Sequence, residues 1–212
     1  MSTPLLIIFQ LIVLIFSVMI HEISHGAVAL KLGDQTAKRA GRLTLNPLRH
    51  LDPIGSFLLP LFLFLLGGPI FGWAKPVPYN PMNLRNPKAG AGLIGAAGPL
   101  SNILLAIVFG LFIRGLSSGT GTEATAVLIT LLQMIVLINI ALAIFNLIPI
   151  PPLDGSNILF ALLPGRYYPI YQFLIRYGFY IIIFLIFFGG FNFIVPIIRG
   201  LYNLIVGSSL VF

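Results

Sequence analysis

The sequence predicts an all-α polytopic membrane protein with about five transmembrane helices and short re-entrant or β-like segments between them. Of its 212 residues, 58% are hydrophobic and only 8% are charged, and the mean hydropathy is +1.04. Soluble globular domains carry about 25% charged residues, so this composition excludes that class. Several apolar stretches also reach the roughly 20 residues that a helix needs to cross a bilayer. No polar stretch is long enough for a soluble module, so we expect one membrane domain over residues 1–212.

The apolar stretches follow one another along the chain with short connectors. They cover residues 4–32, 54–66, 89–114, 124–148, 168–188 and 191–211. The second stretch is short and contains Pro60, which is typical of a re-entrant or interfacial segment. Whether the last stretch, with Pro196 and Arg199, crosses the membrane stays open.

Two connectors are irregular. Residues 41–47 alternate as a short strand bounded by turn residues would, and residues 67–78 are too rich in Gly and Pro for a helix. Non-helical backbone at membrane depth is tolerated only where protein or a water-filled cavity satisfies its polar groups. These two pieces therefore either line a cavity or are ordinary interfacial loops.

The formal net charge of +7 comes from Lys and Arg that cluster near the ends of the apolar stretches. Basic residues at such positions orient membrane proteins, with the basic loops in the cytoplasm. We interpret them as cytoplasmic anchors and expect no nucleic-acid partner. They are Lys31, Lys38, Arg39, Arg42, Arg49, Lys75, Arg85 and Lys88.

A polar tetrad lies inside the first apolar stretch and consists of His21, Glu22, Ser24 and His25. Ionisable side chains within a membrane segment are costly and mark functional sites. On a helix, residues four apart share a face, so His21 and His25 can offer two imidazole nitrogens to one ion, with Glu22 beside it. The chain has no cysteine, so the sequence predicts a zinc ion held by histidine and carboxylate.

A catalytic zinc needs three protein ligands and one open position, and the third ligand has few candidates. For Asp34, Asp52, His50 and Glu123, which fall in polar connectors, a solvated surface position is the favoured interpretation. Asp154 follows a proline-rich break in a long apolar stretch. On its own Asp154 would be interpreted as a helix N-cap, but beside an incomplete metal site the ligand role is favoured.

Amide side chains form a further group of candidates. Asn102 follows a run of small residues that lets helices approach closely, and Asn146 precedes the proline-rich break. Each amide either holds helices together or contacts a bound peptide, and the same two interpretations apply to Gln133 and Asn139.

Together these motifs resemble the site-2 protease family of intramembrane zinc metalloproteases, in a compact form without a PDZ domain. The family's helical tetrad appears as residues 21–25 followed by Gly26, its small-residue motif as residues 98–102, and its Asn-x-x-Pro and Leu-Asp-Gly motif as residues 146–155. The resemblance spans residues 4 to about 163, the expected catalytic core, followed by C-terminal helices over about 168–211.

The resemblance implies a zinc-dependent endopeptidase that hydrolyses peptide bonds in or near the transmembrane segments of single-span membrane proteins, as in regulated intramembrane proteolysis. It implies one zinc ion per chain, bound by His21, His25 and Asp154, with Glu22 as the general base. It also implies that Asn102 and Asn146 lie near the scissile peptide or its oxyanion. The expected partners are a transmembrane protein substrate and the lipid bilayer. The expected location is the cell membrane, with the active site toward the cytoplasmic side.

This ligand set constrains the topology. A cytoplasmic loop after the first apolar stretch places His21 and His25 near the cytoplasmic side. If residues 54–66 crossed fully, the next two crossings would deliver Asp154 to the opposite face, on the order of 20 Å away. Zinc ligands lie about 2 Å from the ion, so we expect residues 54–66 to dip into the membrane and return.

Two rival functions keep the metal but do not need Glu22. One is a zinc-binding membrane transporter, because ionisable residues in membranes often mark conduction routes. The other is a proteolytically silent relative that binds membrane helices. The complete catalytic set favours the enzyme over both.

Overall fold

The structure is a computed structural model that describes residues 3–58, 62, 65, 74–117 and 122–207. Within those residues every regular element is helical, so the predicted all-α membrane fold is confirmed. The longer helices are α1 (Thr3–Lys31), α4 (Pro87–Ser117), α5 (Glu123–Asn146), α6 (Asp154–Leu162), α7 (Tyr168–Phe187) and α8 (Ile194–Val206). The short ones are α2 (Thr36–Arg39), η1 (Pro47–Arg49), η2 (Pro53–Leu58), η3 (Pro81–Asn83) and η4 (Gly165–Tyr167).

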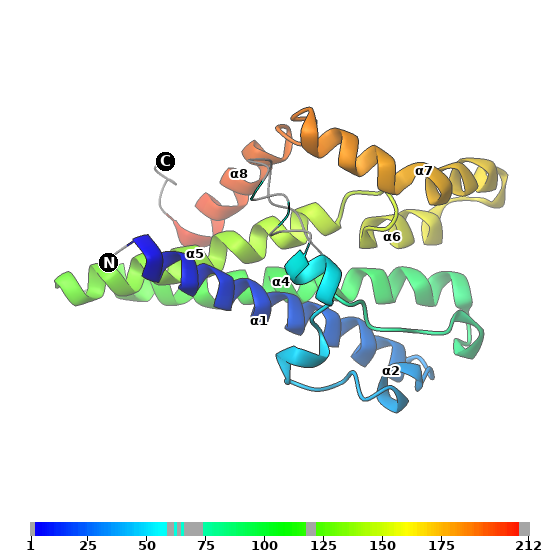
Figure 1. Ribbon diagram of the computed structural model, residues 1–212, viewed down its shortest axis with the longest axis horizontal. Helices are drawn as coiled ribbons and strands as arrows, with labels where there is room; N and C mark the ends of the chain where they lie inside the picture. Colours follow the sequence, from blue (N-terminus) through cyan, green and yellow to red (C-terminus); the bar gives the residue numbers. More distant parts are fainter. Residues whose placement is uncertain (1–2, 59–61, 63–64, 66–73, 118–121, 208–212) are drawn as a thin grey trace.

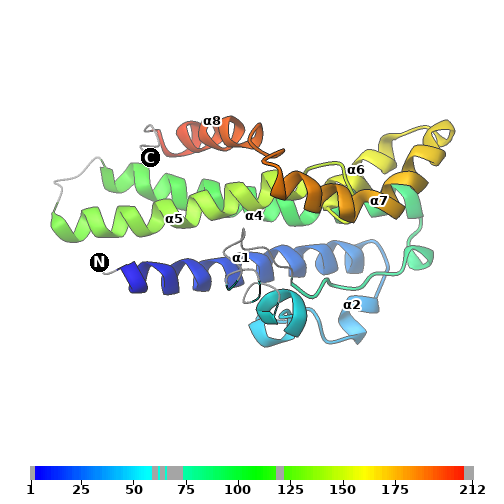
Figure 2. The same cartoon turned by 45° about the horizontal axis from the view of Figure 1, so that its top comes forward.

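Helix α4 is the centre of the molecule. It runs along the long axis beside α1 and α5 and antiparallel to both (Figure 1). Helices α1 and α8 lie on opposite sides of the α4–α5 pair (Figure 2). Helix α6 packs against the first half of α4, where Gly92 and Gly95 permit close approach.

Four helices among the described residues are long and apolar enough to cross a membrane. They are Pro4–Lys31, Pro87–Ser117, Glu123–Asn146 and Gly165–Phe187. Helix α8 has 13 residues. At 1.5 Å per residue it is about 20 Å long, less than the roughly 30 Å of a hydrocarbon core. The predicted set of about five helices thus corresponds to four of spanning length and one shorter helix.

The sequence around the end of α5 explains how the chain turns toward the site. The helix stops at Asn146, and Pro149, Pro151 and Pro152 prevent its continuation. The backbone makes a tight turn after α5, in which the Ile150 amide donates to the Ile148 carbonyl. A Cβ at Gly155 would lie 2.1 Å from the Leu147 carbonyl oxygen, so only glycine lets α6 begin directly against the end of α5.

The short strand predicted over residues 41–47 is wrong. Its polar groups bond to residues close by in the chain. The Arg42 amide donates to the Ala37 carbonyl of α2, the Asn46 amide donates to the Thr44 hydroxyl, and His50 Nε2 lies 2.9 Å from the Thr44 carbonyl oxygen. These local bonds use groups that a strand would offer to a neighbour.

The segment predicted to be re-entrant is described at its start, where Pro53–Leu58 forms the π-helical turn η2, and at Phe62 and Leu65. The Asp52 carboxylate caps this turn by accepting hydrogen bonds from the amides of Ile54 and Gly55. Residues 59–61, 63–64 and 66 of that segment, and residues 67–73 of the irregular segment after it, lie outside the described residues.

The interpretation of Asp34 and His50 as solvated surface residues is wrong, because their exposed fractions are 0% and 2%. Asp34 is buried because it accepts hydrogen bonds from Thr36, Asn80 and Asn83, which join the end of α1 to η3. Desolvation raises the pKa of Asp34, but these hydrogen bonds outweigh it and lower the pKa to about 2. Glu123 is exposed, in agreement with the prediction.

Candidate metal centre and active site

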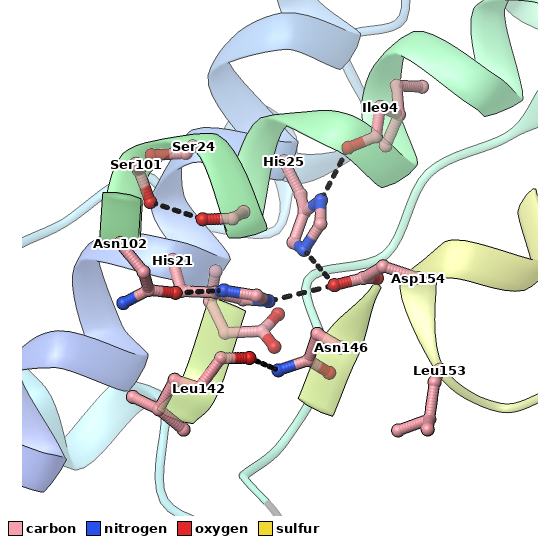
Figure 3. Close-up of polar contacts among 12 residues, drawn as sticks. His21, Ser24, His25, Ile94, Ser101, Asn102, Leu142, Asn146, Leu153 and Asp154 are labelled. Carbon is pink, nitrogen blue, oxygen red and sulfur yellow. Dashed lines mark hydrogen bonds and ion pairs between the residues drawn. The ribbon is translucent and has the colours of Figure 1, made fainter. Parts of the chain in front are cut away.

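The structure brings the two histidines of α1 together with the first residue of α6. His21 Nε2 lies 2.9 Å and His25 Nε2 lies 3.2 Å from the same oxygen, Oδ2 of Asp154 (Figure 3). The two imidazole rings are one helical turn apart, with centroids separated by 4.7 Å. Asp154 therefore points at the histidines, and the N-cap position of α6 is occupied by Leu153 instead of Asp154.

Both rings are turned by hydrogen bonds at their other nitrogen. His25 Nδ1 lies 2.6 Å from the Ile94 carbonyl oxygen, and His21 Nδ1 lies 2.6 Å from Asn102 Oδ1 (Figure 3). An oxygen acceptor at Nδ1 places the proton of a neutral imidazole there and leaves the Nε2 lone pair facing Asp154. Two lone pairs and a carboxylate oxygen then converge, an arrangement that needs a cation between them.

This donor set fits a zinc ion. One ligand atom from each of His21, His25 and Asp154 lies within 4.8 Å of the other two. Donors bonded to a tetrahedral zinc at about 2.0 to 2.1 Å are about 3.3 Å apart, close to the two separations seen here. Hydrogen bonds from the second ring nitrogen to a fixed oxygen are also the usual support of metal-binding histidines.

Gly98 keeps the space beside the rings open. A Cβ built at this position would lie 2.4 Å from His25 Nε2 and 2.5 Å from His21 Nε2. Any side chain on this face of α4 would therefore push into the nitrogens that face Asp154. The run of small residues noted in the sequence thus serves the metal centre as well as helix packing.

The Glu22 carboxylate lies beside the metal centre and is anchored by a loop. Glu22 Oε2 accepts a hydrogen bond of 2.7 Å from the backbone N–H of Val77. The loop is held in turn by the 41–50 segment, since the Lys75 amide donates to the His50 carbonyl and Arg42 Nη2 donates to the Lys75 carbonyl. The described parts of both irregular connectors therefore support the site, and among these residues Ala74, Pro76 and Val77 line its cavity.

A cavity of about 450 Å³ opens next to these residues. The remainder of its wall is largely apolar, and its polar side chains include His21, Glu22, His25, Asn146, Asp154 and Asn157. This composition, a few convergent polar groups in an apolar cleft, is typical of binding and catalytic sites. Its apolar walls include Leu142 and Phe145 of α5, Phe179 and Ile182 of α7, and Val77 of the loop before η3.

The two candidate amides have different positions. Asn146 lines the cavity, and its Nδ2 donates to the Leu142 carbonyl (Figure 3). Asn102 has an exposed fraction of 0%, lies behind His21 and does not line the cavity. Its amide group contacts the His21 ring, Asn139 and the Ser17 carbonyl.

Sequence reasoning missed three contributions to the site. The Val77 amide and the α7 residues Phe179 and Ile182 reach it only through tertiary structure, so no local pattern reports them. The sequence does not decide the part played by Asn139, although a buried amide in a membrane helix is a signal of function.

The geometry agrees with comparisons to known proteins. The model of peptidase family M50 matches residues 116–189, which include Asn146 and Asp154 but not the histidines of α1. The "Putative zinc metalloprotease YwhC" of Bacillus subtilis (strain 168) is 42% identical over 160 residues, covering 74% of this chain and 69% of that protein. The chain belongs to peptidase family M50, the site-2 protease family.

Two further relatives have lower identity to this chain. The "Putative zinc metalloprotease Rip2" of Mycolicibacterium smegmatis is 32% identical over 146 residues, which cover 68% of this chain and 53% of that protein. The Mycobacterium tuberculosis H37Rv protein of the same name is 31% identical over 139 residues, 66% of this chain and 51% of that protein. No solved structure matches the chain. As a member of family M50, the chain is a multi-pass membrane zinc metalloprotease.

Proposed function

We propose that the chain is an intramembrane endopeptidase that cleaves peptide bonds in or near the transmembrane segments of single-span membrane proteins. The observation that carries this proposal is the convergence of His21, Glu22, His25 and Asp154 on one cavity, enclosed by helices of membrane-spanning length. Regulated intramembrane proteolysis, in which an earlier cut prepares the substrate, is the process in which we expect it to act.

The size of the cavity favours a short stretch of substrate. The cavity measures about 450 Å³. One turn of a helix, about 10 Å wide and 5.4 Å high, occupies about 420 Å³. The cavity therefore holds a stretch of substrate far shorter than a transmembrane helix. A peptide carbonyl within a helix is hydrogen-bonded to the amide four residues on, so we expect the substrate to unwind locally before cleavage.

In the mechanism that we propose, His21, His25 and Asp154 hold the zinc ion. When bound, zinc supplies Lewis acidity that lowers the pKa of water and polarises the peptide carbonyl. Glu22 removes a proton from the attacking water, whose oxygen forms a bond to the carbonyl carbon. Glu22 then delivers that proton to the departing amine nitrogen as the C–N bond breaks.

The remaining polar residues position these groups. The Val77 amide fixes one oxygen of Glu22, and we assign proton transfer to the other oxygen. Asn146 lies at the cavity wall, where its amide can donate to the developing oxyanion, a contribution of about 3 kcal/mol. We assign Asn102 to orienting His21 instead of contacting the peptide, because it is fully buried.

We further propose that the active site faces the cytoplasm. The end of α1, the start of α4 and the turn before α7 lie at one end of the bundle (Figure 1). That end carries Lys31, Lys38, Arg39, Arg85, Lys88 and Arg166. At the opposite end, the described residues near the α4–α5 connection include Arg114 and Glu123. Such a distribution is typical of a basic cytoplasmic side.

The proposal is tested with purified protein in lipid nanodiscs and a panel of single-span membrane proteins, each prepared intact and with its extracytoplasmic domain removed. The wild type should cleave at least one truncated substrate. The Glu22→Gln variant should keep its zinc and cleave about 10² to 10⁴ times more slowly. Cleavage that is unaffected by Glu22→Gln, or a wild type that cleaves only soluble peptides, would refute the proposal.

A further inference from the structure

We infer that Asn139 is a positioning residue of the metal centre, which acts through Asn102 to set the tautomer of His21. The inference rests on the proposed ligand role of His21. It assigns a function to a polar group in the middle of α5 that neither the ligand set nor the general base requires.

The residues concerned form a buried polar chain across three helices. Asn139 Nδ2 donates to Ser17 Oγ of α1 at 3.0 Å, and Asn139 Oδ1 accepts from Asn102 Nδ2 of α4 at 2.8 Å. Asn102 Oδ1 then lies 2.6 Å from His21 Nδ1. Ser17 is 4% exposed and both asparagines are 0% exposed, so bulk water does not take part.

The direction of this chain is fixed at its far end by a backbone carbonyl. Asn139 Nδ2 also donates to the Ile135 carbonyl oxygen of its own helix at 2.9 Å, and a carbonyl oxygen can only accept. The amino group of Asn139 must therefore face Ile135, which turns Asn139 Oδ1 toward Asn102. The amino group of Asn102 must in turn face that oxygen.

The orientation of Asn102 then decides which nitrogen of His21 carries the proton. Asn102 Nδ2 donates to Asn139 Oδ1 at 2.8 Å and, at a longer 3.4 Å, to the Ser17 carbonyl. Asn102 therefore presents only its oxygen to His21, so His21 Nδ1 must donate. The proton of the neutral ring is placed on Nδ1, and the Nε2 lone pair faces Asp154. A flipped Asn102 would present its amino group instead, which favours a proton on Nε2, where it blocks metal binding.

Helix packing alone does not account for these contacts. The Ser17 hydroxyl can rotate and serve as donor or acceptor, so it fixes no direction, whereas Asn139 has one orientation that satisfies all of its partners. His25 needs no such chain, because its Nδ1 faces the Ile94 carbonyl oxygen directly. Each ring needs an oxygen acceptor at Nδ1. A backbone oxygen supplies it at His25, and the pair Asn102 and Asn139 supplies it at His21.

The test measures zinc affinity by competition with a chelator series, at equal protein concentration and in the same detergent. Asn139→Leu should weaken zinc binding about 10- to 100-fold, the usual effect of losing a residue that supports a metal ligand. Ser17→Ala should change it less than about three-fold, since the Ile135 carbonyl still orients Asn139. The double variant Asn102→Leu/Asn139→Leu should bind zinc as tightly as Asn102→Leu alone, because Asn139 acts only through Asn102.

Gln133→Leu is the matched control. Gln133 is a partly buried amide on the same helix that hydrogen-bonds Tyr202 instead of the site. Asn139→Leu with zinc affinity equal to this control, or Ser17→Ala as harmful as Asn139→Leu, would overturn the inference in favour of a packing role. His21→Ala tests the premise separately: if it keeps wild-type zinc affinity, the proposed ligand set fails, whatever Asn139 does.

Discussion

At the scale of single residues, the site depends on where each polar atom finds its partner. His21 and His25 share a face of α1 by their spacing, and this much follows from the sequence. The partners of their Nδ1 atoms, Asn102 and Ile94, are 81 and 69 residues away in the chain. No local pattern encodes those contacts, which is why the sequence left the role of Asn102 open.

Replacing Gly98 with alanine should disrupt the metal centre. The added Cβ would fall within 2.5 Å of both Nε2 atoms, so the rings must move away from Asp154. We expect zinc affinity to drop at least about ten-fold, as for other losses of ligand orientation. Zinc content after dialysis against a chelator measures this.

Gly115→Ala is the control for that experiment, since it lies on the same helix and a Cβ there would meet no atom within 4 Å. It should keep its zinc and gain up to about 1 kcal/mol of helix stability. Equal zinc retention by the Gly98 and Gly115 variants would contradict the role assigned to Gly98.

At the scale of elements, the sequence predicts the helices well and the connectors poorly. Apolar stretches at residues 89–114 and 124–148 correspond to α4 and α5, because about 20 apolar residues leave few alternatives in a membrane. The alternation at residues 41–47 predicts a strand, but the Thr44 hydroxyl accepts from the Asn46 amide and the Thr44 carbonyl faces His50 Nε2, so these groups are used locally. The Arg42 side chain instead donates to the Lys75 carbonyl, 33 residues away in the chain, a contact that the pattern does not contain.

The connection between α1 and η3 should lose stability in acid because of Asp34. Its folded pKa of about 2 lies below the ordinary 3.8, so its stabilising effect is complete above about pH 4 and is lost as the pH falls through 2. Asp34→Ala should lower the unfolding free energy by about 2 to 4 kcal/mol at pH 7, because it removes several buried hydrogen bonds.

Thermal unfolding in detergent at stepped pH checks this prediction, with Glu123→Ala as an exposed control. The wild type and Asp34→Ala should unfold at different temperatures at pH 7 and should converge toward pH 2. A difference that stays constant between pH 7 and pH 2 would show that the Asp34 carboxylate is not the source.

At the scale of the whole molecule, polarity is distributed as a bilayer requires. Leu104, Leu111 and Phe112 of α4 are 58 to 61% exposed, whereas Asn102 on the same helix is fully buried. Composition predicts this distribution, since a lipid solvent favours apolar outer faces and satisfied polar groups inside. Hydropathy alone does not show which helices lie side by side. The approach of Asp154 in α6 to His21 and His25 in α1 is predicted only because a zinc ion needs a third ligand.

The proposed orientation predicts a labelling pattern for two single-cysteine variants. The chain has no native cysteine, and Ala40 and Ala124 are exposed residues near opposite ends of the bundle. A membrane-impermeant thiol reagent added to intact cells should label Ala124→Cys and leave Ala40→Cys unlabelled until the cells are opened. The reverse pattern would place the metal centre toward the outside.

The central claim is that His21, His25 and Asp154 hold one zinc ion together, and zinc stoichiometry in purified protein tests it most directly. Mass spectrometry of the metal should find one zinc per chain in the wild type and in the exposed-site control Glu123→Ala. Asp154→Ala, correctly folded by circular dichroism, should contain almost none. A folded Asp154→Ala that keeps a full equivalent of zinc would contradict the account.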